Sequence, residues 1–423
     1  MKKRVIRFLV FGLFLVSSPS VYAQKLLIPM DLEQTDHLKA YGIAFWALEK
    51  NISVEWLLNY RGGTFLLDYS EAVAKESRLR DVRFSQISSA QAARIYADME
   101  SQNMDRILLE KAPKIAVYTP PNKQPWDDAV TLALVYAEIP YETLWDEEVL
   151  DGKLSEYDWL HLHHEDFTGQ FGKFFRSHGR QLWYRQQQAY YESLARKLGF
   201  KKVSQLKGAV ALTIFDYIQE GGFLFAMCSA TDTFDISLAS AGSDIVDTVY
   251  DGDPADPSAQ AKLSYAATLA FENFKIVLDP MEYEHADIDL TPTQMKQIRG
   301  PEADAFTLFE FSAKYDPVPT MLTQNHVPIV RGFLGQTTAF RKGRIKKSIA
   351  ILGEITGTEH VKYIHGNMGS GTFTFYAGHD PEDYRHLVGD PPTQLILHRN
   401  SPGYRLILNN ILFPAAKKQK RKT

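Results

Sequence analysis

Short apolar runs alternate with helical patterns along most of the chain. The runs 25–31 (KLLIPMD) and 53–60 (SVEWLLNY) have the length and composition of strands. The segment between them places large apolar residues at helical spacing on one face: Leu38, Tyr41, Phe45 and Leu48. A further strand-like run and a helical pattern follow. We therefore predict a small α/β region over residues 24–112.

The same alternation resumes with longer apolar runs after this region. The runs KIAVY, YDWLHLHH and GGFLFAMC are separated by segments of helical spacing, one of which carries Ala129, Leu132, Ala133 and Tyr136. Strands that alternate with helices in this way predict βαβ units around a parallel sheet. We predict a main α/β domain over residues 113–415, in which the helices flank the sheet, with insertions near 167–200 and 258–340.

The two ends of the chain differ from the rest. Residues 1–23 combine a basic start, an apolar core from Phe8 to Val16 and a small-residue cleavage site, which is the pattern of a signal peptide. The apolar core is too short to span a bilayer. We predict cleavage after Ala23, a periplasmic or secreted location and no integral membrane span in the mature chain. Residues 416–423 form a basic tail.

Composition narrows the possible partners. The 423-residue chain has a formal charge of −4, and removal of four basic residues with the signal peptide gives −4 − 4 = −8. An acidic body argues against nucleic acid as a partner. We expect a small-molecule substrate as the partner, on the basis of the candidate site described below. The chain has one cysteine, so it forms no internal disulfide. Composition leaves the oligomeric state open.

That cysteine, Cys228, lies where the run GGFLFAM ends and the helix-starting run SATDTFD begins. In a parallel α/β sheet, ligands gather at the carboxyl ends of the strands. The N–H groups of a following helix lower the pKa of a thiol at its N-terminus. Cys228 is therefore a candidate nucleophile, and the alternative is a small buried residue near a strand end.

The segments KIAVY, IPYETLWDEEVLDGKLSEYDWLHL and IQEGGFLFAMCSA resemble the class I glutamine amidotransferase-like fold. GTFTFYAGHDPEDYRH and SPGYRLILNNILFPA are similar to the end of its trehalose-utilisation-like members. The resemblance covers about residues 114–415 and implies a flavodoxin-like sheet. It also implies catalytic roles: Cys228 as nucleophile, His379 as base, Asp380 or Glu382 as the group that orients His379, and the Ser229 N–H as an oxyanion donor.

Two features depart from that family. Ala226 and Ala230 stand where the family has glycine around its nucleophile, and the acid lies next to His379 or three residues after it, not two. The chain also resembles exported bacterial proteins labelled asparagine synthetase B. It lacks the N-terminal cysteine and the Ser-Gly-Gly-x-Asp-Ser loop that ATP-dependent asparagine synthesis requires.

The run LHLHHED ends a predicted strand with three histidines. His161 and His163 share a face of an extended segment and are candidate ligands for a divalent metal such as zinc. His164 points the other way unless the strand has already ended. We predict that His163, His164 and Glu165 contact substrate, and the alternative is hydrogen-bonded histidines at a strand terminus.

Polar residues also follow the first two predicted strands. Asp31, His37, Asn59 and Arg61 are candidate substrate contacts in a pocket between the two regions. The guanidinium of Arg61 suits a carboxylate or a phosphate. A plain surface turn is the alternative reading of Arg61.

Three functional hypotheses follow. The first is a cofactor-free, cysteine-dependent hydrolase or transferase acting on a small polar substrate through Cys228 and His379. The second is a non-catalytic protein that binds a carbohydrate or another ligand in the same cleft. The third is a metal-dependent enzyme that uses His161 and His163.

Overall fold

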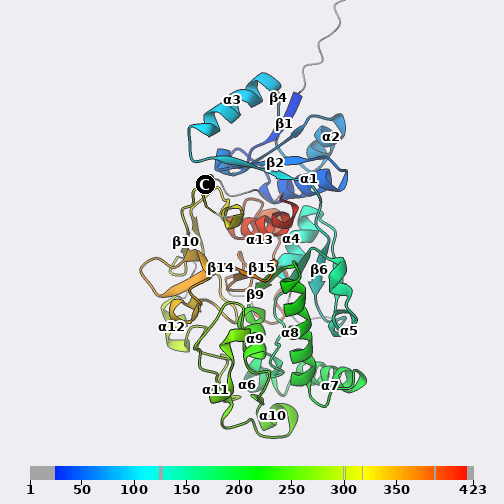
Figure 1. The fold of residues 1–423 in the computed structure, drawn as a ribbon, viewed down its shortest axis with the longest axis vertical. Coiled ribbons are helices and arrows are strands. Elements are labelled where there is room, and N and C mark those ends of the chain that lie inside the picture. The colour runs from blue at the N-terminus through cyan, green and yellow to red at the C-terminus, as the bar shows by residue number, and fades with distance from the viewer. Residues whose placement is uncertain are drawn as a thin grey trace, which may run out of the picture.

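The computed structural model describes residues 24–122, 127–298, 300, 302–316, 318–384 and 387–416. The predicted signal peptide and the basic residues of the predicted tail lie outside these ranges. The described chain is a mixed α/β structure with two sheets (Figure 1), which confirms the predicted class at that level.

The first sheet is antiparallel throughout and has the order β4-β1-β3-β2-β5. Its strands are β1 (Gln24–Ile28), β2 (Val54–Leu58), β3 (Thr64–Asp68), β4 (Ser85–Ser88) and β5 (Asp105–Leu109). Its helices are α1 (His37–Glu49), α2 (Glu71–Leu79) and α3 (Ser89–Glu100). Because β1 and β2 both pair antiparallel with β3, they run in the same direction and end at the same edge of the sheet.

The second sheet has ten strands, nine of them in the order β11-β10-β13-β14-β15-β9-β8-β6-β7, and β12 pairs with β14. The strands β15, β9, β8, β6 and β7 are parallel, and the others pair antiparallel. Their bounds are β6 (Ile115–Tyr118), β7 (Glu142–Leu144), β8 (Trp159–Leu162), β9 (Phe223–Met227), β10 (Phe306–Leu308), β11 (Ile329–Val330), β12 (Phe340–Arg341), β13 (Ala350–Glu354), β14 (His360–Met368) and β15 (Gly371–Tyr376). The stretch 258–340, predicted as an insertion, thus supplies β10, β11 and the first residue of β12 to this sheet.

The remaining helices connect and cover these strands. They are α4 (Ala129–Ala137), α5 (Asp146–Leu150), α6 (Phe175–His178), α7 (Leu182–Lys197), α8 (Val203–Gln219), α9 (Ser229–Ala239), α10 (Thr248–Asp251), α11 (Ala259–Lys262), α12 (Pro292–Gln297) and α13 (Pro402–Leu412). Within the described ranges, none of the helices has both the length and the apolarity needed to cross a lipid bilayer.

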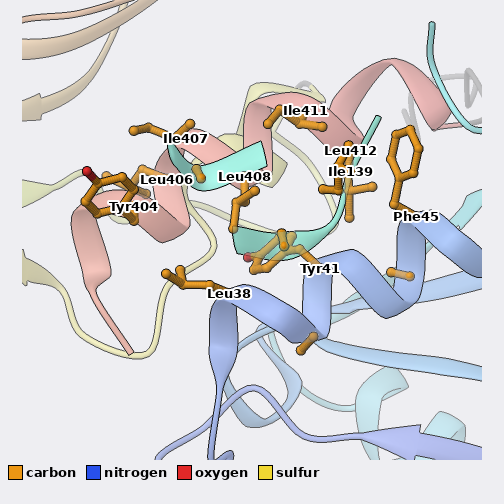
Figure 2. Packing of buried hydrophobic residues seen from close by; sticks show 14 of the residues in the cluster. Leu38, Tyr41, Phe45, Ile139, Tyr404, Leu406, Ile407, Leu408, Ile411 and Leu412 are labelled. Carbon is orange, nitrogen blue, oxygen red and sulfur yellow. The ribbon is translucent and has the colours of Figure 1, made fainter. Parts of the chain in front are cut away.

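Helix α13 lies between the two sheets (Figure 1). Its apolar side chains pack against α1, where Tyr41 and Phe45 face Leu408 and Leu412 (Figure 2). One continuous apolar core therefore includes residues of the first sheet, α1, α4 and α13. Helix α13 therefore joins the two regions by burying apolar surface on both.

A buried arginine adds polar contacts to this junction. Arg405 of α13 has no exposed surface. Its Nη1 donates to the Met30 carbonyl (2.7 Å), its Nη2 to the Gly62 carbonyl and its Nε to the Tyr41 hydroxyl (3.1 Å). The planar guanidinium presents several donors at fixed angles, so one side chain satisfies acceptors from three segments of the first region.

Replacing Arg405 with methionine keeps the length of the side chain and removes its donors. Because two carbonyls and a hydroxyl then lose a buried donor, we expect the free energy of unfolding to fall by about 2–4 kcal/mol. Urea denaturation measures this change, with Arg94→Met on the exposed face of α3 as the control. Equal stability of the two variants would contradict the assignment.

Candidate functional site

The carboxyl ends of four neighbouring parallel strands form one edge of the second sheet. In the pairing, Leu162 of β8 lies beside Ala226 of β9, and Tyr376 of β15 lies beside Met227. The residues that follow these strands are therefore brought together. Backbone hydrogen bonds connect the turns: Cys228 N–H donates to the Gly378 carbonyl and Ala230 N–H to the His163 carbonyl, both at 3.1 Å.

Cys228 occupies a sharp turn between β9 and α9. Its φ of 51° and ψ of −142° lie outside the regions that most L-residues adopt, and α9 begins at the next residue. A strained residue between a strand and a helix is the geometry of a nucleophile elbow, in which the turn presents a side chain above the sheet edge. Strain of this kind is found mainly at functional sites.

The environment of the Cys228 sulfur opposes its ionisation. The residue is 4% exposed, and burial raises the pKa of its thiol to about 12. Hydrogen bonds from the backbone N–H groups of Ser229 and Gln336 act in the opposite direction but are outweighed. The lowered thiol pKa expected from the helix N-terminus is therefore wrong, because desolvation of the thiolate exceeds the stabilisation by those N–H groups.

Three histidines converge at the same edge. One ring nitrogen from each of His163, His164 and His379 lies within 4.8 Å of the other two. The ring centroids are 4.1 Å apart for His163 and His164, 4.6 Å for His163 and His379, and 4.9 Å for His164 and His379. Strand β8 ends at Leu162, so alternation stops there and His164 turns to the same side as His163.

His161 and Asp128 contact His163. The Nδ1 of His163 lies 3.3 Å from His161 Nε2 and 3.6 Å from Asp128 Oδ2. His161 is fully buried; its Nδ1 donates to the Phe225 carbonyl (3.1 Å) and its Nε2 lies 3.1 Å from Asp128 Oδ2. Both nitrogens of His161 thus have contacts inside the protein. The predicted metal pair of His161 and His163 forms, with Asp128, one group of three potential ligands within 4.8 Å, and His163 also belongs to the group with His164 and His379.

Asp128 was not among the residues singled out from the sequence. Its Oδ1 caps α4 by accepting from the N–H groups of Val130 (2.7 Å) and Thr131 (2.9 Å). Burial favours a higher pKa for Asp128, but the neighbouring rings of His161 and His163 outweigh it, and the pKa falls well below its usual range. Asp128 therefore stays ionised beneath the histidines. Its position as the cap of the helix that follows β6 was the available signal.

A cavity of about 670 Å³ opens beside this group. Its polar lining includes His164, Cys228, Ser229, Gln336 and His379. Its volume falls in the range typical of small-molecule sites, about 300–1,000 Å³. The predicted nucleophile, oxyanion donor and base thus share one cavity with His164.

The two carboxylates predicted to orient His379 have contacts with the C-terminal segment. Asp380 Oδ2 accepts from the Tyr404 hydroxyl and its Oδ1 from the Glu382 N–H, both at 2.8 Å. Glu382 Oε2 lies 3.0 Å from His398 Nδ1. These contacts tie both carboxylates to the segment before and within α13, and their role toward His379 stays a prediction.

Glu165 is not among the residues that line the cavity beside Cys228. Its Oε2 accepts from the His163 N–H (3.1 Å), and burial raises the pKa of its carboxyl to about 7. It lines a separate small cavity of about 30 Å³ beside Lys207. Glu165 therefore fixes the loop that carries the histidines, and its predicted contact with substrate stays a prediction.

The four polar candidates of the first region, Asp31, His37, Asn59 and Arg61, do not line the cavity beside Cys228. Asp31 and Asn59 line a cavity of about 620 Å³ together with Asn325 and His326 of the second region. Arg61 is engaged by its own neighbours, with Nε 2.6 Å from Asp31 Oδ2 and Nη2 2.5 Å from Glu33 Oε2. The expected anion contact of Arg61 is thus replaced by an internal salt bridge.

His37 lies in the wall between the two regions. Its ring contacts that of His326 in a tilted arrangement at a centroid distance of 4.5 Å, and its Nε2 lies 2.8 Å from the Asp31 carbonyl oxygen. Burial, with the nearby Arg405 and His326, lowers the pKa of His37 to about 3. His37 is therefore neutral at physiological pH and acts as a packing residue of the junction.

No protein-family model matches the chain, and no curated protein matches it. The cytoplasmic proteins STM3548 and STM1381 of Salmonella typhimurium are 11% and 14% identical, each covered over 100% of its length and 72% of this chain, with TM-scores of 0.34 and 0.35. The GH42 beta-galactosidase Gan42B is 10% identical over 64% of this chain and 28% of its own, with a TM-score of 0.29. Likeness at this level supports no inference about function.

Thiolate is the form of cysteine that reacts with iodoacetamide. Because burial raises the pKa of the Cys228 thiol to about 12, we expect iodoacetamide at pH 8 to label the native protein at least about 100-fold more slowly than the denatured protein. Mass spectrometry of the Cys228 peptide over time measures both rates. Native labelling as fast as denatured labelling would show a reactive thiolate and contradict the effect of burial.

Proposed function

We propose that the protein is a metal-dependent hydrolase whose metal ion is held by His163, His164 and His379. The convergence of one ring nitrogen from each residue within 4.8 Å carries the proposal. Nitrogens bound to one zinc ion lie about 3.3 Å apart, as follows from zinc–nitrogen distances of about 2.0–2.1 Å in tetrahedral geometry. Binding of one ion by all three residues therefore requires the rings to bring these nitrogens closer together.

The surroundings fit a bound cation. Metal-ligating histidines usually donate a hydrogen bond from their other ring N–H to a carboxylate or a carbonyl, which fixes the ring and makes it a better ligand. His163 has this arrangement, because its Nδ1 faces the ionised Asp128 and His161. A set of imidazoles suits zinc among the abundant divalent metals.

The cavity supplies the open position that catalytic sites keep. Catalytic zinc sites commonly have three protein ligands and a fourth position for water or substrate, and the ion lowers the pKa of water to about 7. His164 and His379 line the cavity of about 670 Å³, so a substrate in it lies beside the proposed ligands. The protein's own part is to hold the rings, through Asp128 and His161, and to admit substrate from one side.

Cysteine-dependent hydrolysis is the second candidate, and the elbow conformation of Cys228 favours it. In that mechanism Cys228 attacks the substrate, His379 is the base, and the Ser229 N–H stabilises the oxyanion. The raised thiol pKa counts against it. Among the described residues, the sulfur of Cys228 is not part of the group of metal-ligating atoms that includes His379.

We also propose the finer fold assignment and the location. Five parallel strands with a strand-to-helix elbow at Cys228 support a flavodoxin-like, class I glutamine amidotransferase-like second region. The signal-peptide pattern of residues 1–23 supports export to the periplasm or beyond.

Substitution of His163 or His379 by alanine tests the main proposal. We expect the purified wild type to hold about one zinc per chain and to hydrolyse 4-nitrophenyl acetate, and each variant to lose the zinc and at least about 100-fold in activity. Inductively coupled plasma mass spectrometry and absorbance at 400 nm measure the two effects. His360→Ala, on β14 and outside the group, is the control.

Cys228→Ser separates the two candidates in the same assays. Retention of zinc and of most activity supports the metal-dependent mechanism. Loss of activity with zinc retained, or activity in a wild type that holds no metal, would overturn it in favour of the cysteine.

Asp128→Asn tests the support beneath His163. Asparagine keeps an oxygen to cap α4, so the fold is preserved, but it loses the negative charge behind the imidazole. We expect zinc affinity, measured by competition with a chromogenic chelator, to fall about 10–100-fold. Wild-type affinity in this variant would show that Asp128 has only a capping role.

A further inference from the structure

The cavity beside the histidines has two chemically different parts. Its polar floor consists mainly of side chains near the carboxyl ends of β8, β9 and β15, with Gln336 from the segment before β12. The rest of its lining is mainly apolar and comes from segments outside those strands: Phe174, Tyr283, Met295, Leu334, Tyr384, Leu387 and Val388. A ligand that fills the cavity must therefore present a polar group to one end and apolar surface to the other.

The apolar part reaches the protein surface. Leu387 is 66% exposed, Val388 38% and Tyr283 37%. Large apolar side chains grouped around one opening are uncommon on a soluble protein without a binding role. Covering them with an apolar ligand removes this surface from water, which is favourable.

These wall segments are tied to one another. The Tyr384 hydroxyl donates to the Ile298 carbonyl just after α12. The Leu387 N–H donates to Asp390 Oδ2 at 3.0 Å, which holds the turn that carries Leu387 and Val388. One hydrogen bond thus joins the Tyr384 segment to the residue after α12, and the other holds the neighbouring turn.

We infer that the substrate is a small amphipathic molecule, with a hydrolysable polar group at His164 and His379 and an alkyl or aryl chain along Met295, Leu334 and Leu387. This inference rests on the proposed function and names its substrate class. It differs from the small polar substrate predicted from the sequence, because the sequence did not place residues 283, 295, 334 and 387 around one cavity.

A small molecule fits this site better than a protein partner. The apolar wall is continuous with the histidine floor, so one ligand spans both. The volume of about 670 Å³ matches a ligand of drug size, since such sites measure about 300–1,000 Å³.

A series of straight-chain hydroxamic acids, from acetohydroxamic to octanohydroxamic acid, tests the inference, because the hydroxamate head binds zinc and only the chain varies. Isothermal titration calorimetry is done with zinc-loaded protein and with chelator-treated protein. We expect affinity to rise about two- to fourfold per methylene in both, with tighter binding throughout in the zinc-loaded protein.

Comparison of the zinc-loaded and the chelator-treated protein distinguishes the metal site from the amphipathic substrate site. A chain-length effect without any effect of zinc supports the amphipathic site and overturns the metal site. A zinc effect without a chain-length effect supports the metal site and overturns the inference drawn here.

The variant Leu387→Ser tests where the alkyl chain of the ligand binds. We expect the ratio of octanohydroxamate to acetohydroxamate affinity to fall at least about fivefold, because the exposed wall loses apolar contact. Leu79→Ser, on α2 and 70% exposed, is the matched control. An unchanged affinity ratio in Leu387→Ser would overturn the inference. It would also be overturned if light scattering showed a dimer for the wild type and a monomer for Leu387→Ser, because a second copy would then cover the apolar wall.

Discussion

The parallel pairing of β6, β8, β9 and β15 is the constraint on which the candidate site depends. These strands are distant in sequence, but they end side by side, so Asp128, His163, Cys228 and His379 come to one edge of the sheet. Two backbone hydrogen bonds, from Cys228 to Gly378 and from Ala230 to His163, lock the turns that follow. A change of pairing would separate all four side chains at once.

Burial at this edge disfavours the thiolate of Cys228, which a nucleophile needs. The ionised Asp128 adds a negative charge that stabilises a cation nearby. Desolvation of the sulfur therefore weakens the cysteine mechanism, and the charge of Asp128 strengthens the metal-dependent one.

Much of this architecture could be predicted from local pattern. The strand and helix around Cys228 followed from an apolar run that ends at a helix start, and the run of histidines marked the end of β8. The convergence of His379 with His163 and His164 could not be predicted from spacing alone, because it depends on the order of strands in the sheet. The pKa of Cys228 depends on its burial in the folded chain, which its local sequence does not show, and the Gln336 N–H that partly offsets this burial lies far away in sequence. The role of Asp128 beside the histidines could not be predicted for a further reason. An aspartate at a helix start is explained by capping alone, and Asp128 does cap α4.

The metal ion itself is the most direct test of this account. Crystals of the purified protein, grown without added metal and measured on both sides of the zinc absorption edge, locate any zinc by anomalous scattering. The account predicts one peak about 2.0–2.1 Å from ring nitrogens of His163, His164 and His379. A map without a peak there, or with zinc only among Asp244, Asp251 and Asp253, the acidic group beside Lys202, would contradict it.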